Sequence, residues 1–177
     1  LRDLLDPARP WHDTNGPYFG RPTAEEMDNQ AQAYEALAEA DPADFPSPRE
    51  HPLPIVENAT GLVVGTVSWY WEDERTDWRR LGVVILDEDA WGKGYATEAL
   101  GRFTSYVFDS TDTLRLDLAT YSENAGMLAV AKRLGFVEEA RMRKARRWSG
   151  GVHDAVVYGV LREEWAAACE RHGLVWE

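Results

Sequence analysis

The chain has 177 residues, of which 44% are apolar and 28% are charged; these values are typical of a globular protein and exclude wholesale disorder. A chain of this length most simply forms one domain, which we predict to span residues 1–177. The net charge of −12 argues against nucleic acid as the main partner and is explained either by solubility alone or by a cationic substrate.

Cysteine usage and hydropathy exclude several other classes of protein. The single cysteine, Cys169, rules out an internal disulfide, and the spacing of cysteines and histidines predicts no metal site. There is neither an apolar run of membrane length nor a secretory leader, so we expect a cytoplasmic protein that does not bind a membrane. Because the chain opens on Leu1 without a methionine, we also expect that some sequence lies upstream.

The first quarter of the chain is rich in proline and contains one clear helix. Residues 1–20 indicate a short helix that runs into a loop. Thr23 to Glu26 have the spacing of a capping box, and apolar residues at helical intervals then predict a helix over residues 24–40. The dense prolines of residues 42–54 predict an exposed connector.

The remainder of the chain alternates between strands and helices. Strands are predicted over residues 53–57, 62–71, 78–86 and 114–120, and a closing hairpin is predicted over residues 136–147 and 153–161. Helices are predicted from residue 95, after residue 124 and from about residue 162. The continuous apolar character of residues 81–86 favours a strand that is covered on both faces.

A glycine turn joins the strand 78–86 to the helix that follows it. The small residues Gly92, Gly94 and Ala96 allow a bulky anion to approach the backbone, and the free N–H groups at a helix start favour negative charge. We therefore predict a phosphate-bearing ligand here, the alternative being that the glycines only shape the turn. The spacing does not match the Walker pattern, and Thr97 stands where the dinucleotide pattern needs its third glycine.

Two motifs of this chain resemble those of the GCN5-related N-acetyltransferase superfamily, in particular the branch of the ribosomal-protein alanine acetyltransferases. The family pattern Gln/Arg-x-x-Gly-x-Gly/Ala matches residues 91–96, with Trp91 in place of the usual polar residue. The later family element, an asparagine followed by a helix and Gly-Phe, matches Asn124 to Phe136. The resemblance covers residues 80–165.

The resemblance implies an α/β fold with a mixed, mostly antiparallel sheet that is flanked by helices. Two central parallel strands, here 81–86 and 114–120, are expected to splay apart and open a wedge for the pantetheine arm of acetyl-CoA. The family's first strand has no candidate in this chain, so we expect it upstream of Leu1.

The resemblance also implies which residues hold acetyl-CoA. Backbone groups of residues 83–86 are expected to pair with the pantetheine amides and the thioester oxygen, and backbone N–H groups of residues 92–97 to hold the pyrophosphate. Asn124 is expected to contact the pantetheine arm or a water, the alternative being an ordinary helix N-cap. The predicted cofactor-binding residues are Val83, Val84, Ile85, Leu86, Trp91, Gly92, Lys93, Gly94, Tyr95, Ala96, Thr97 and Asn124.

The groups that move protons are less clear from the sequence. Relatives carry a tyrosine or a serine after the asparagine as a thiolate proton donor, but this chain has Ala131 and Met127 at those positions. Tyr121 or a water is predicted to serve instead, the alternative being that the thiolate leaves unprotonated. Glu72 is the predicted general base, because it follows an aromatic run that shields a nearby carboxylate from water. The other candidates for the base are Asp73, Glu74, Asp87, Glu88, Asp89 and His12.

The predicted function is N-acetylation of a primary amine, either a protein N-terminus or a small amine, by direct transfer from acetyl-CoA. The missing proton donor keeps open an alternative, a non-catalytic domain that binds or senses acyl-CoA. The basic run over residues 141–147 is explained either by a solvated edge strand or by an acidic acceptor. We expect no nucleic-acid or membrane partner, and we leave a homodimer open.

Overall fold

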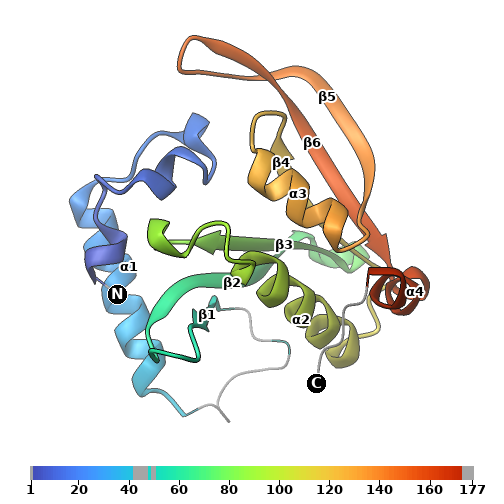
Figure 1. Cartoon of the computed structure of the whole chain (residues 1–177), viewed down its shortest axis with the longest axis horizontal. Coiled ribbons are helices and arrows are strands. Elements are labelled where there is room, and N and C mark those ends of the chain that lie inside the picture. Colours follow the sequence, from blue (N-terminus) through green and yellow to red (C-terminus); the bar gives the residue numbers. More distant parts are fainter. Residues whose placement is uncertain (1, 42–47, 49–50, 173–177) are drawn as a thin grey trace.

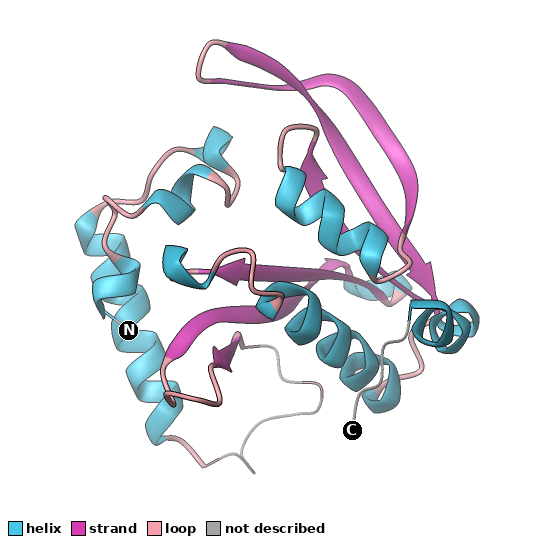
Figure 2. Cartoon of the chain, viewed as in Figure 1, coloured by secondary structure: helices cyan, strands magenta, loops and turns pink. Residues whose placement is uncertain are grey.

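The computed structural model describes residues 2–41, 48 and 51–172, which form one six-stranded sheet with helices around it (Figures 1 and 2). The strands are β1 (Leu53–Val56), β2 (Val63–Asp73), β3 (Trp78–Ile85), β4 (Arg115–Tyr121), β5 (Val137–Trp148) and β6 (Gly151–Leu161). The helices are α1 (Ala24–Glu39), α2 (Tyr95–Ser110), α3 (Ala125–Arg133) and α4 (Arg162–His172). The strand order is β1-β2-β3-β4-β6-β5, and among these described strands only β3 and β4 pair in parallel. This confirms the predicted fold class.

Local chemistry explains where several elements begin and turn. The Thr23 hydroxyl accepts from the N–H of Glu26 at 3.2 Å, and the Glu26 carboxylate accepts from the N–H of Thr23 at 2.7 Å, which completes the predicted capping box. β5 and β6 are joined by Ser149 and Gly150, both with positive φ, as a two-residue hairpin turn requires.

The N-terminal segment differs from its prediction. Instead of one helix and a loop, it forms three short 3-10 helices, Arg2–Leu5, Pro10–Asp13 and Pro17–Phe19. Prolines begin two of them, because a residue without an N–H is tolerated in the first turn of a helix. The proline-rich connector lies mostly in the stretches 42–47 and 49–50, outside the described residues. Of the described residues ahead of Leu53, none lies in a strand, and a strand upstream of Leu1 stays a prediction.

The main core lies between α2 and the sheet. Leu100, Phe103 and Val107, which recur at helical spacing, belong to one buried cluster with Leu116 and Leu118 of β4. A second cluster joins the N-terminal segment to the sheet, where it meets the end of β3; its buried members are Leu5, Trp11, Ala31 and Leu86. Among the helices of the described residues, none combines the length and apolar character needed to cross a membrane.

The centre of the sheet opens between β3 and β4. These strands pair only at Arg79 with Leu116 and at Arg80 with Asp117. Beyond that point β3 continues to pair with β2, and β4 continues to pair with β6 as far as Tyr121. The two strands therefore separate toward their C-terminal ends, as the resemblance implied, and Figure 1 shows the β4-β6-β5 half of the sheet turned away from β3.

Candidate functional site

A large cavity of about 1280 Å³ lies where the two central strands part. Its walls come from β2, β3, β4, the glycine turn, the start of α2, helices α1 and α3, and the N-terminal segment. The predicted site residues that line it are Val83, Val84, Ile85, Leu86, Trp91, Gly92, Lys93, Gly94, Tyr95, Ala96, Thr97, Tyr121 and Asn124. The structure thus brings together every predicted site residue except Glu72.

The glycine turn leaves the start of α2 open toward the cavity. Gly92 and Gly94 have φ values of 74° and 92°, which side chains rarely adopt, and a Cβ at either position would meet no other atom within 4 Å. These glycines are therefore required by backbone conformation and not by crowding within the chain. Gly94 caps α2 without any side-chain hydrogen bond, so the first N–H groups of the helix have no capping partner from that residue.

A hydrogen bond from a distant turn anchors the first residue of α2. The hydroxyl of Tyr95 donates to the carboxylate of Glu57, between β1 and β2, and this carboxylate also accepts from the Thr60 hydroxyl at 2.7 Å. The bond from Tyr95 lowers the pKa of Glu57, and the same bond raises the pKa of the Tyr95 phenol. The start of α2 is therefore held against the β1–β2 hairpin.

Only alternate residues of β3 turn their backbone groups toward the gap. The N–H of Leu86 donates to the Val64 carbonyl of β2 at 2.9 Å, so strand alternation directs Val84 and Leu86 to β2 and directs Val83 and Ile85 to the gap. This corrects the prediction that all four residues offer backbone groups to a ligand. The indole N–H of Trp91 donates a hydrogen bond to the Ile85 carbonyl at 3.0 Å, and Trp91 also lines the cavity.

Tyr121, at the end of β4, is enclosed by aromatic rings and by the N-terminal segment. Its side chain is buried, and its hydroxyl donates to the Asp13 carbonyl at 3.4 Å. Tyr18 and Trp148 meet its ring edge-on, with centroids at 6.0 and 5.8 Å. Burial raises the pKa of the Tyr121 phenol, which therefore keeps its proton at neutral pH.

The predicted basic run lies on β5, the edge strand of the sheet, and most of its side chains are exposed. Arg141 pairs with Glu138 at 2.7 Å and with Asp154 at 3.3 Å. The guanidinium of Arg146 lies 4.4 Å from the ring centroid of Tyr18, a residue that lines the cavity. One member of the run thus reaches the border of the cavity.

Asn124 is the N-cap of α3, which was the alternative to a ligand contact. Its side-chain oxygen accepts from the N–H of Met127 at 3.0 Å and caps α3. Its side-chain nitrogen donates to the Thr14 carbonyl at 3.2 Å. The residue therefore fixes the start of α3 and connects it to the N-terminal segment, and contact with a ligand stays a prediction.

Glu72 lies outside the cavity, contrary to the role predicted for it. It belongs to β2, which continues to Asp73, and its carboxylate forms an ion pair with Arg80 at 2.6 Å near the closed end of the gap. A carboxylate held there is not placed to take a proton from an amine inside the cavity. We therefore withdraw Glu72 as the candidate base.

The other candidates for the base are engaged elsewhere or lie outside the cavity lining. His12 is buried and stacks on Trp11, and burial lowers its pKa. Asp73 pairs with Arg75 at 3.0 Å, and Glu88 pairs with Arg9 at 2.7 Å. None of the predicted candidates, which also included Glu74, Asp87 and Asp89, lines the cavity.

Among the described residues that line the cavity, only Glu98 and Glu123 carry carboxylates. Glu98 stands in the first turn of α2 and pairs with Arg102 at 3.1 Å. Glu123 lies two residues after Tyr121, and sequence reasoning missed it, although it directly precedes the motif residue Asn124. Within the described part of the chain, no group of three or more histidine, cysteine or acidic residues is placed to hold a metal ion.

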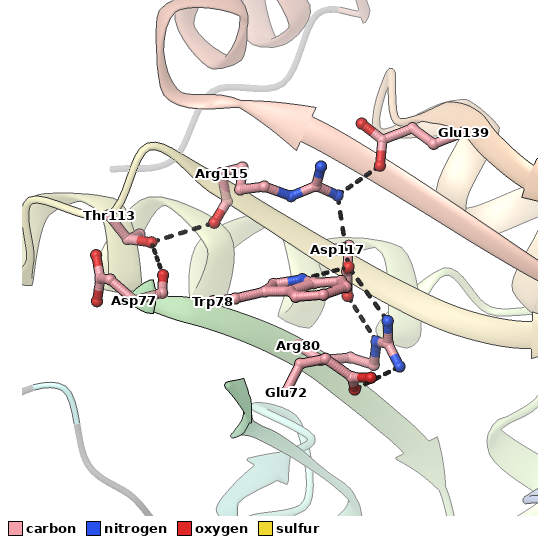
Figure 3. Close-up of polar contacts among 8 residues, drawn as sticks. All are labelled: Glu72, Asp77, Trp78, Arg80, Thr113, Arg115, Asp117 and Glu139. Atoms are coloured by element: carbon pink, nitrogen blue, oxygen red, sulfur yellow. Dashed lines mark hydrogen bonds and ion pairs between the residues drawn. The ribbon is translucent and has the colours of Figure 1, made fainter. Parts of the chain in front are cut away.

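A buried carboxylate closes the narrow end of the gap (Figure 3). Asp117 of β4 is fully buried and accepts hydrogen bonds from the Trp78 indole at 2.7 Å and from Arg80 Nε at 2.6 Å, both on β3. Arg115 adds a contact at 3.4 Å and also pairs with Glu139. Burial opposes the charge on Arg80 and is the largest single influence on its pKa, but Asp117 and Glu72 together outweigh it, and the pKa of the guanidinium is raised.

Comparison with known proteins gives matches at the level of the family and of the fold. Residues 8–137 match the family model of the acetyltransferase (GNAT) domain. The N-acetyltransferase p20 of Bacillus licheniformis, itself uncharacterised, is 27% identical over 63% of this chain and 62% of its own length. YdaF of Bacillus subtilis (strain 168), named as a proposed ribosomal N-acetyltransferase, is 30% identical over 59% of this chain and 57% of its own. The matches thus span about three fifths of these curated relatives.

A solved structure supports the fold over most of the chain. The crystal structure of a GNAT-family acetyltransferase from Bacillus anthracis superposes with a TM-score of 0.72 at 18% identity. The superposition covers 93% of this chain and 88% of the other. At this identity the likeness concerns the fold alone.

Two substitutions of Asn124 distinguish how much each of its two hydrogen bonds contributes to stability. Asn124→Ala removes the N-cap of α3, and we expect it to lower the free energy of unfolding by about 0.5–2 kcal/mol. Asn124→Asp keeps an oxygen that accepts from Met127 but loses the donor to Thr14, so it should retain most of the stability. Urea denaturation of the three proteins measures the difference, and an unchanged midpoint for Asn124→Ala would show that the cap contributes nothing.

Proposed function

We propose, from the premise that this chain belongs to the GNAT acetyltransferase family, that it transfers an acetyl group from acetyl-CoA to a primary amine. The observation that supports this most directly is the gap between β3 and β4, which continues into the open start of α2. Its volume of about 1280 Å³ exceeds the range of about 300–1,000 Å³ that is usual for a single small ligand. Two substrates together require such a space.

The residues present fit the long, anionic shape of acetyl-CoA. The unpaired backbone groups of Val83 suit the amides of a pantetheine arm that takes the place of a missing strand between β3 and β4. The start of α2 offers N–H groups and the positive end of its dipole to a diphosphate. Lys93 and Arg133 are the two cationic side chains that line the cavity, and they complement the negative charge of the nucleotide.

In the proposed reaction, the amine nitrogen forms a bond to the thioester carbonyl carbon, and the carbon–sulfur bond breaks. The amine gives up a proton, and the thiolate that leaves takes one. We assign the first proton to Glu123, directly or through a water. Glu98 is paired with Arg102 at 3.1 Å beside the phosphate turn, whereas the contact of Glu123 with His153 Nδ1 is longer, at 3.9 Å. Tyr121 is the proposed donor to the thiolate, because it lines the cavity and its phenol carries a proton at neutral pH.

The charges of the cavity lining favour an acceptor substrate that carries one positive charge. Away from α2, aromatic rings and neutral polar groups predominate, and Glu123 is the carboxylate on that side. A polycation loses hydration at several charges when it enters the cavity and needs several carboxylates to offset this cost. An acceptor with a single ammonium group needs only one carboxylate. A protein N-terminus and a small monoamine both meet this condition. The likeness to a relative that is named as a proposed ribosomal N-acetyltransferase favours the protein N-terminus.

An acceptor screen distinguishes a catalyst from a binding domain. We expect free CoA thiol to appear when the protein is given acetyl-CoA and an amine, with peptides that carry a free N-terminus more active than polyamines. A thiol-reactive dye follows the release, and mass spectrometry identifies the acetylated product. Tight binding of acetyl-CoA without turnover on any acceptor would instead support the non-catalytic alternative.

Gly94→Ala tests the phosphate turn. A side chain at φ 92° strains the backbone, so the start of α2 should shift and the affinity for CoA should fall by about tenfold or more. Gly150→Ala is a matched control, because Gly150 also has a positive φ of 74° with no atom near its Cβ, but lies in the β5–β6 turn. Calorimetric titration with CoA measures both variants, and equal affinities would contradict the assignment of the turn.

Glu123→Gln tests the proposed base. Turnover at neutral pH should fall by about 100-fold, while the affinity for CoA stays the same, because the substitution removes only the proton acceptor. Glu72→Gln removes a carboxylate outside the cavity and should not reproduce this loss of turnover. Steady-state kinetics with a saturating acceptor measure the turnover of both variants. Full activity of Glu123→Gln would remove Glu123 from the mechanism.

A further inference from the structure

We propose that Asp117 is a positioning residue that fixes the point at which β3 and β4 part, and thereby the width of the slot that receives the pantetheine arm. The inference rests on the proposed function for the identity of that ligand. Asp117 touches no substrate in this scheme and acts through the two strands that it joins. It is buried in the core of the sheet and does not line the cavity.

The backbone alone gives the junction of the two strands little support. β3 and β4 share only two residue pairs, and short stretches of parallel pairing are weak by themselves. Asp117 belongs to the second of these pairs, opposite Arg80. The next residues along the two strands, Leu81 and Leu118, are already part of the cavity wall. The carboxylate therefore sits at the last paired position before the gap opens.

The side chain of Asp117 supplies a cross-strand connection at this position. Both of its shortest bonds, at 2.7 and 2.6 Å, go to side chains of β3, namely Trp78 and Arg80, while Arg115 contacts it from its own strand (Figure 3). Hydrogen bonds between ionised groups are stronger than neutral ones. A fully buried carboxylate is also costly to leave unpaired, so Asp117 resists separation from its donors.

Beyond the junction, β3 and β4 pair with different strands, β2 and β6, and the N-terminal segment packs at the far ends of both. β3 ends against β2, where the N–H groups of Leu86 and Asp87 both donate to the Val64 carbonyl. At the end of β4, Tyr121 and Asn124 bond to carbonyls of the N-terminal segment. The strands therefore do not pair with each other at the open end, and their direct backbone pairing lies at the closed end. A shift at Asp117 changes the angle between them and the space available at Val83.

Two further carboxylates belong to the cluster but do not bond to Asp117 itself. Glu72 pairs with Arg80, and Glu139 of β5 pairs with Arg115 (Figure 3). Glu139 contacts neither β3 nor Asp117 in the described structure. It therefore provides a control that removes a charge from the same cluster but keeps the bonds of Asp117 to Trp78 and Arg80.

The test compares two ligands on the same proteins. In Asp117→Asn, the affinity for CoA should fall by about tenfold, equivalent to about 1.4 kcal/mol, because the pantetheine arm lies in the slot. The affinity for 3′-phospho-ADP, the nucleotide end of CoA alone, should change by less than about twofold, because the glycine turn is untouched. Glu139→Gln should bind both ligands like the wild type. Calorimetric titration at a temperature at which circular dichroism shows each protein folded gives the constants.

The outcomes separate this inference from its alternatives. Wild-type affinity of Asp117→Asn for CoA, or an equal loss for both ligands, would overturn it, the latter because a general loss of stability acts on the whole site. If Asp117→Asn does not fold, Trp78→Phe removes one donor and keeps the ion pair, and a smaller loss confined to CoA is expected. Retention of full CoA affinity there would also overturn the inference.

Failure of the proposed function gives a different result. If the chain binds acetyl-CoA without turnover, the comparison of the two ligands stands unchanged; if the cavity does not receive acetyl-CoA at all, the wild type would bind neither CoA nor 3′-phospho-ADP. Hydrogen exchange without ligand still tests the junction, because the amides of residues 79–81 and 116–118 should exchange faster in Asp117→Asn, or in Trp78→Phe, than in Glu139→Gln. Unchanged exchange at these residues would overturn the role of Asp117 independently of any ligand.

Discussion

The buried carboxylate of Asp117 holds β4 to β3 at the one place where the two parallel strands meet. A sheet with a gap at its centre lacks the continuous ladder of backbone hydrogen bonds that usually holds neighbouring strands together. Here side chains supply the missing connection at the closed end, through Trp78 and Arg80. The two halves of the sheet, β1-β2-β3 and β4-β6-β5, can then be paired internally and still leave a cavity between them.

The cavity combines backbone and side-chain surfaces that suit different parts of one elongated ligand. Along β3, alternation leaves Val83 facing the gap, and beyond the strand two glycines with positive φ turn the chain into an uncapped helix start. Main-chain groups place few demands on residue identity, so such a surface tolerates the replacement of a polar residue by Trp91. The indole even adds an attachment, because it binds the carbonyl of Ile85.

The other side of the cavity depends on contacts between segments that are far apart in the chain. The N-terminal segment reaches the end of β4 through the Asp13 and Thr14 carbonyls, and the tip of the β5–β6 hairpin reaches it through Trp148. These segments surround Tyr121 and shield it from water, which raises the pKa of its phenol. The border of the cavity thus carries a phenol that keeps its proton at neutral pH.

Local patterns in the sequence determined the elements and the turn that matters most for the proposed cofactor. The spacing of apolar residues predicted α2, the capping box predicted α1, and the glycines at 92 and 94 marked the bend before α2, because each of these depends on neighbours within a few residues. Only the tertiary structure decided which carboxylates meet the cavity. Glu72 follows an aromatic run, yet strand pairing places it beside Arg80, whereas Glu123, which no pattern marked, lines the cavity because β4 ends there. The partners of Asp117 likewise come from another strand, and the distance along the chain between them hides such a contact from any local pattern.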